Sequence, residues 1–176
     1  SAPNYLEMLK GKIIARDDFP NKTEPYWGTA NPADYKYSKD VFTLAVKCAS
    51  DFITKHENDT TDDRRAQVAF LQYLLFQVKN VSPTHYISSN QLVAVIREYL
   101  NHRITKNYLF RRVSAPLRDD GVIIASCSHG YKIPISVKDI TTYLNQTHTI
   151  VSPMLHRVEV CRNLVLENTY GNFDIL

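Results

Sequence analysis

The chain has 176 residues, a net charge of +3, 44% hydrophobic residues and 22% charged residues. These values are typical of globular domains and exclude a disordered, collagen-like or disulfide-rich chain. The length indicates a single domain, or one domain with a small second domain. Glycine is scarce: the chain has five glycines, which is under half the number that an average usage of roughly 7% would give. This scarcity disfavours folds built on glycine-rich phosphate- or dinucleotide-binding loops.

The sequence carries few signals of compartment or processing. It has no run of about 18 apolar residues, so we expect no membrane span. Its first residues lack the basic head and apolar stretch of a signal peptide. Because it opens on Ser1, we expect it to begin after processing or at an internal boundary. The odd, widely spaced cysteines Cys48, Cys127 and Cys161 favour reduced thiols and therefore a cytoplasmic protein.

Residues 1–60 are predicted to form an irregular segment followed by a helix. A short helix is expected over residues 5–9, and the prolines within residues 20–32 predict a long irregular stretch after it. Such a stretch is either functional or the remnant of a larger domain. Ser38 is expected to cap a helix that ends near Lys55.

Residues 61–136 show helical spacing first and strand-like composition later. The first expected helix is capped by Thr61 or Asp62 and ends near Asn80, and a short apolar segment, Tyr86-Ile87, follows it. A second helix is capped by Ser88 or Ser89 and ends near Leu100, and a third runs from Thr105 through about Leu117. Two strands are then expected over residues 122–126 and 131–135. Gly121 lies where the third helix ends, and Gly130 lies in the turn between the strands.

This order resembles a winged helix-turn-helix domain of bacterial or phage type over residues 62–135. Residues 117–134 carry the resemblance: a Leu-Arg pair ends the third helix, and a glycine, an apolar strand, a small polar tip and a Gly-Tyr-Lys return follow. The resemblance implies a mainly α fold with a small β-hairpin, whose third helix enters the DNA major groove. It implies a protein that binds double-stranded DNA, either as a transcriptional regulator or as the DNA-targeting domain of a larger protein.

A rotation of about 100° per residue assigns the two faces of the third helix. Leu109, Phe110, Val113 and Leu117 fall on the core side, whereas Ala115 falls on the outer side, where it would allow close approach to DNA. The DNA-binding residues expected from the outer face, its flank, the preceding turn and the hairpin are Arg103, Thr105, Asn107, Tyr108, Arg111, Arg112, Arg118, His129 and Lys132.

These residue types suit the chemistry of the major groove. Arginine can bind guanine through two hydrogen bonds, asparagine can bind adenine, and the remaining cations can hold phosphates. The sequence departs from a regular helix at Pro116, which removes one helical hydrogen bond and disfavours helical angles at the residue before it. We therefore expect a kink or an end there, which would move Arg118 off the binding face.

The net charge is unevenly placed. Residues 81–135 hold seven Lys or Arg against three Asp or Glu, whereas residues 1–80 hold eleven of each kind. Residues 136–176 hold three Lys or Arg against four Asp or Glu. The whole positive excess therefore falls in the predicted winged helix, where phosphate contacts would need it.

Residues 137–176 are predicted to form a C-terminal helical extension. Ser136 is expected to cap a helix that ends near Leu144, and Pro153 is expected to restart one. An apolar stripe follows at helical spacing: Met154, Leu155, Val158, Cys161, Leu164 and Val165. This stripe fits either packing onto the first helices or a homodimer contact.

Two other functions stay open at this point. The same helix face could bind a protein partner, since winged helices serve several purposes. Alternatively, the chain could target a nuclease or phage-defence effector whose catalytic part lies upstream. The sequence itself indicates no catalytic residues and no cofactor. Cys127 and His129 are close enough to ligate a metal, but no second pair at zinc-finger spacing completes a site.

Overall fold

The structure is a computed structural model that describes residues 24–146 and 160–167. It is mainly helical with one small antiparallel sheet of two strands, which confirms the predicted fold class. The helix expected over residues 5–9, Pro153, and the stripe residues Met154, Leu155 and Val158 lie outside the described residues.

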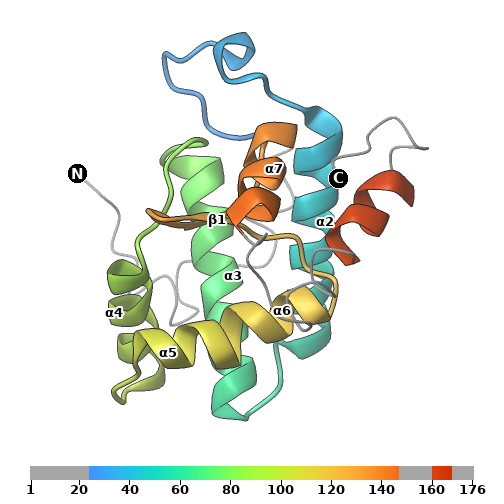
Figure 1. Cartoon of the computed structure of the whole chain (residues 1–176). Helices are drawn as coiled ribbons and strands as arrows, with labels where there is room; N and C mark the ends of the chain where they lie inside the picture. The colour runs from blue at the N-terminus through green and yellow to red at the C-terminus, as the bar shows by residue number, and fades with distance from the viewer. Residues whose placement is uncertain (1–23, 147–159, 168–176) are drawn as a thin grey trace.

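The first two long helices begin where the sequence predicts. α2 (Lys39–His56) follows Ser38, whose hydroxyl accepts from the Val41 N–H, and a short 3-10 helix, η2 (Pro32–Tyr35), precedes it. α3 (Asp62–Asn80) follows Thr61, whose hydroxyl accepts from the Arg64 N–H. Each cap satisfies one N–H that the helix itself cannot pair. α3 is buried along most of its length and lies at the centre of the molecule (Figure 1).

The next two helices pack against α3. α4 (Ser89–Leu100) is capped by Ser88, whose hydroxyl accepts from the Gln91 N–H. One continuous helix then crosses α3 (Figure 1) and consists of α5 (Lys106–Tyr108), η3 (Leu109–Ser114) and α6 (Ala115–Asp119). Thr105 caps it, as predicted, by accepting from the Tyr108 N–H at 3.0 Å. We refer to residues 106–119 as the crossing helix.

The middle of the crossing helix is a π-helix. The N–H of Ala115 donates to the carbonyl of Phe110, five residues earlier. Pro116 has no N–H for the carbonyl of Arg112, and that carbonyl accepts instead from Nε2 of the buried Gln67 at 2.9 Å. The helix therefore does not end at Pro116, which was one of the two predicted outcomes. The widened turn and the amide from α3 carry the helix through the proline to Asp119.

The hairpin consists of β1 (Ala125–Cys127) and β2 (Gly130–Lys132), so the paired segments are shorter than predicted. On its other edge, β2 forms a bridge to Ile87, with N···O distances of 2.8 and 2.9 Å between Ile87 and Tyr131. Gly130 has a φ of 139°, and a Cβ there would lie 1.9 Å from the Ile87 carbonyl oxygen. Only glycine fits this crossing of two backbones.

Two helices follow the hairpin, and they pack against β1 and beside α2. α7 (Val137–Gln146) follows Ser136, which accepts from the Asp139 N–H at 3.1 Å, and packs on β1. Residues 160–167 form a further helix, drawn beside α2 in Figure 1. Its Cys161 and Val165 are buried in the same hydrophobic core as α2 and α3, so this part of the predicted stripe packs within the chain.

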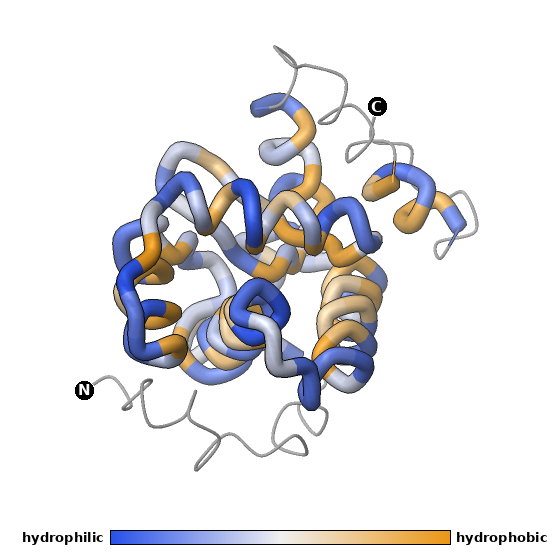
Figure 2. The backbone as a smooth tube through the Cα atoms, turned by 90° about the horizontal axis from the view of Figure 1, so that it is seen from below, coloured by the Kyte–Doolittle hydropathy of each residue, from blue (hydrophilic) through white to orange (hydrophobic). Residues whose placement is uncertain are grey.

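The hydropathy of the residues along each helix agrees with this packing. In Figure 2, apolar stretches alternate with hydrophilic stretches along the helices, as expected for helices with one buried side. Within the described residues, no helix combines the length and the apolar content needed to cross a membrane.

Candidate nucleic-acid interface

Four polar side chains lie exposed along the turn before the crossing helix and on the helix itself. They are Arg103, Lys106, Asn107 and Arg111, and we call them the basic face. Within the part of the chain that the structure describes, none of these side chains makes a hydrogen bond or an ion pair. Three cations and one amide are therefore available to a ligand.

Tyr108 and Arg112 flank the basic face but already have a partner in α3. The Tyr108 hydroxyl donates to Asp63 Oδ1 at 2.6 Å, and Arg112 Nη1 lies 3.7 Å from Asp63 Oδ2. Burial raises the pKa of Tyr108, and the hydrogen bond to Asp63 raises it further, so the hydroxyl stays protonated. The Arg112 side chain is 65% exposed, and its charge is partly balanced by Asp63.

A second ion pair lies at the turn before the crossing helix. His102 Nε2 is 2.9 Å from Asp62 Oδ2, and His102 Nδ1 is 3.2 Å from the Arg103 carbonyl oxygen. The backbone contact is the larger cause of a raised pKa at His102, and Asp62 adds to it. Thr105, predicted to contact DNA, is exposed and its hydroxyl serves as the helix cap. Sequence reasoning missed His102 because its partner lies forty residues away.

Arg118 lies off the binding face, as the position of Pro116 led us to expect, and its burial contradicts its inclusion among the DNA-binding residues. It is 5% exposed, and Nη2 donates to the Ile124 carbonyl at 2.8 Å and to Ser126 Oγ at 3.0 Å. The guanidinium also lies over the ring of Tyr143, 3.9 Å from its centroid. These contacts hold the end of the crossing helix to the hairpin and to α7.

The expected surface position of Lys132 is also wrong. Lys132 is 3% exposed, and its ammonium pairs with Asp139 of α7. Asp139 also accepts from the Ile135 N–H at 2.9 Å and from the Tyr86 hydroxyl at 3.3 Å. Burial lowers the pKa of Lys132, while Asp139 opposes this shift. The pair therefore anchors the hairpin and leaves no free cation there.

The π-helix changes two further assignments. Phe110, predicted on the core side, is 39% exposed, and Ala115, predicted on the outer side, is buried. Ser114 is also buried, and its hydroxyl lies 3.3 Å from the Phe110 carbonyl oxygen. The reason is that a π turn rotates each residue less than the 100° that an α-helix does.

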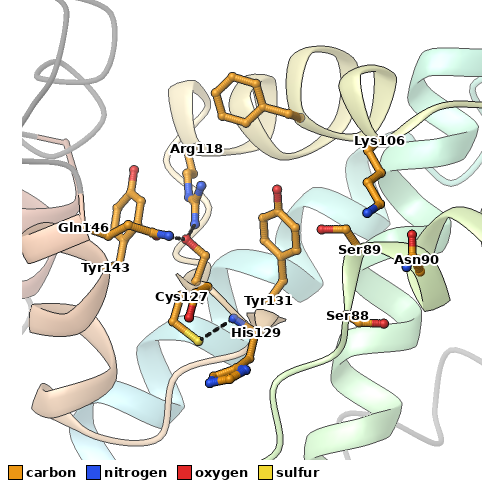
Figure 3. Close-up of a pocket in the computed structure, with 14 residues that line it drawn as sticks. Ser88, Ser89, Asn90, Lys106, Arg118, Cys127, His129, Tyr131, Tyr143 and Gln146 are labelled. Atoms are coloured by element: carbon orange, nitrogen blue, oxygen red, sulfur yellow. Dashed lines mark hydrogen bonds between the residues drawn. The ribbon is translucent and has the colours of Figure 1, made fainter.

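A pocket of about 420 Å³ adjoins the basic face. It lies between the start of α4, the crossing helix and the hairpin, and Lys106, Phe110 and His129 are among its lining residues. Figure 3 shows Ser89, Asn90 and Lys106 on one side of Tyr131 and Arg118 on the other. His129 is exposed in the hairpin turn, and its N–H donates to Cys127 Sγ at 3.3 Å. The hairpin and the crossing helix thus reach the same pocket.

No protein-family model, curated protein or solved structure matched the chain. Among residues 24–146 and 160–167, no group of three or more His, Cys, Asp or Glu side chains could hold a metal ion. The geometry of the basic face is therefore what bears on function.

Proposed function

We propose that the protein binds double-stranded DNA through the basic face. The observation that carries this proposal is the exposure of Arg103, Lys106, Asn107 and Arg111 on adjacent parts of one surface without protein partners in the described residues. Contacts to phosphate oxygens and base edges use such donors. Elsewhere in residues 81–135, Arg118 and Lys132 are buried, so their charges do not contribute to this surface.

The topology supports the proposal independently. α3, the bridge residue Ile87, α4, the crossing helix and the hairpin follow one another in the order of a winged helix-turn-helix, and Ile87 pairs beside β2 as a third strand would. In helix-turn-helix domains the recognition helix lies in the major groove. We assign the role of recognition helix to the crossing helix, because it follows α4 after a short turn.

Each member of the basic face then has a role set by its chemistry. Arg111 can bind the O6 and N7 atoms of guanine, and Asn107 can bind the N6 and N7 atoms of adenine. Arg103 and Lys106 lie nearer the start of the helix and hold backbone phosphates. Thr105 positions them by capping the helix.

This activity fits a transcriptional regulator or the DNA-targeting domain of a larger bacterial or phage-related protein acting in the cytoplasm. A homodimer through the C-terminal helix would match paired half-sites in DNA. Cys161 and Val165 are buried in the core of their own chain, so other residues of that extension would have to form the contact.

The test compares two single-charge removals. Arg111→Ala should weaken binding to a DNA duplex enriched from a random library by roughly 10- to 100-fold, the usual cost of losing a base-contacting arginine. Lys39→Ala, which removes an exposed cation from α2, is the matched control and should change affinity less than about twofold. Equal effects of the two substitutions would contradict the proposal.

A further inference from the structure

Phe110 is an exposed aromatic side chain within a polar surface. Its side chain is 39% exposed, and it is the exposed large hydrophobic residue of the crossing helix. In the described part of the chain, the others are Tyr26, Tyr35 and Val81, which lie outside this helix. Phe110 also lines the pocket between the crossing helix and the hairpin.

The π-helix places Phe110 at the surface. In a regular α-helix, the spacing from Leu109 to Val113 and Leu117 would put Phe110 on the buried side. In η3, Ser114 is buried instead, and its hydroxyl contacts the Phe110 carbonyl. π-helical turns are rare and occur often at functional sites. The fold therefore exposes an apolar ring that a regular helix would bury.

The surroundings of Phe110 favour one kind of ligand. Lys106 lies one turn earlier and lines the same pocket, while Asn107 and Arg111 are exposed beside it. An apolar protein groove would have to desolvate these cations, which is costly. The major groove instead offers phosphates to the cations, and its one apolar group is the 5-methyl group of thymine.

We propose that Phe110 determines specificity for thymine by packing its ring against the 5-methyl group in the major groove. This inference rests on the proposed binding of DNA by the basic face. The hydrophobic contribution of one methyl group corresponds to about a fourfold change in affinity at 25 °C. Phe110 thus supplies apolar readout beside the hydrogen-bonding readout of Asn107 and Arg111.

The test removes single methyl groups from the DNA. The highest-affinity duplex is enriched from a random library with the full chain, and each thymine is then replaced in turn by deoxyuridine. For the unmodified protein, at least one replacement should weaken binding about fourfold. Phe110→Ala should bind the thymine and deoxyuridine duplexes equally at that position. Val81→Ala, the matched exposed control at the far end of α3, should discriminate as the unmodified protein does.

Other outcomes would contradict either the reading of thymine by Phe110 or the binding of DNA itself. If every deoxyuridine duplex binds as well as its thymine parent, or if Phe110→Ala keeps the discrimination, Phe110 does not read thymine. If the library yields no preferred sequence although duplex binding occurs, the inference also fails while the proposed function stands. If no duplex binds at all, the proposed function itself is wrong. Circular dichroism of Phe110→Ala should match that of the unmodified protein, because the ring lies at the surface.

Discussion

The guanidinium of Arg118 lies 3.9 Å from the ring centroid of Tyr143 and donates hydrogen bonds to the Ile124 carbonyl and Ser126. Arg118, which the sequence had suggested for DNA contact, therefore joins the crossing helix, the hairpin and α7. Arg118→Ala should destabilise the fold by about 3 kcal/mol, because charged hydrogen bonds and a buried cation–π contact are lost together. Urea unfolding measures this change.

The same variant separates a structural from a DNA-binding role. At a temperature where it remains folded, Arg118→Ala should bind duplex DNA within about twofold of the unmodified protein, since the side chain is 5% exposed. Unchanged stability together with a large loss of affinity would place Arg118 at the interface and contradict its structural assignment.

Gly130 and Gly121 form a matched pair of glycines with positive φ. Gly130→Ala should cost more than about 3 kcal/mol, because its Cβ would lie 1.9 Å from the Ile87 carbonyl oxygen and would break the bridge to Tyr131. At Gly121 the nearest atom to a Cβ is 3.6 Å away, so Gly121→Ala should cost only the backbone strain, about 1 kcal/mol. Thermal unfolding should rank them in this order. Equal losses would mean that the crossing at Ile87 is wrong.

Gln67 supports the π-helix from α3. Its amide donates to the Arg112 carbonyl, which Pro116 cannot pair, and its carbonyl accepts from Arg64 at 3.0 Å. Gln67→Leu keeps the volume but removes both hydrogen bonds of this buried amide, so we expect a loss of about 1–3 kcal/mol. Chemical denaturation tests this, with Gln72→Leu as the comparison, because Gln72 is a half-buried glutamine of α3 whose side chain makes no hydrogen bond within the described residues. A neutral Gln67→Leu would show that the carbonyl does not depend on Gln67.

His102 should titrate above its ordinary pKa near 6.5, because the Arg103 carbonyl and Asp62 favour its charged form. Since the pKa is higher in the folded state, the stabilising contribution is present below pH 6.5 and is lost as pH rises through the folded-state pKa. NMR titration of the ring should show the raised value. Asp62→Asn should lower it only part of the way, because the backbone contact remains. A His102 pKa at or below 6.5 would contradict this arrangement.

The sequence predicted the helix starts and the fold class because these depend on local chemistry. Ser38, Thr61, Ser88, Thr105 and Ser136 each accept a backbone N–H near the start of the helix expected to follow. Local signals of this kind involve residues only three positions apart.

The errors arise where distant residues decide the outcome. Pro116 signalled an irregular helix, but the partner that lets the helix continue, Gln67, lies 45 residues from Arg112. A fixed rotation of 100° cannot represent the π-helix, so Phe110 and Ala115 were assigned to the wrong faces. Lys132 is buried because Asp139, on the following helix, neutralises it. The alternation of residues in a strand does not reveal such a partner.

The salt dependence of duplex binding tests the proposed function most directly. Fluorescence anisotropy with a random-sequence duplex should be measured for the full chain at 50 and 200 mM salt. If Arg103, Lys106 and one further arginine each neutralise a phosphate, affinity should fall by roughly 40-fold between these concentrations. Absence of duplex binding at the lower salt concentration, or an affinity that does not change with salt, would contradict DNA binding through the basic face.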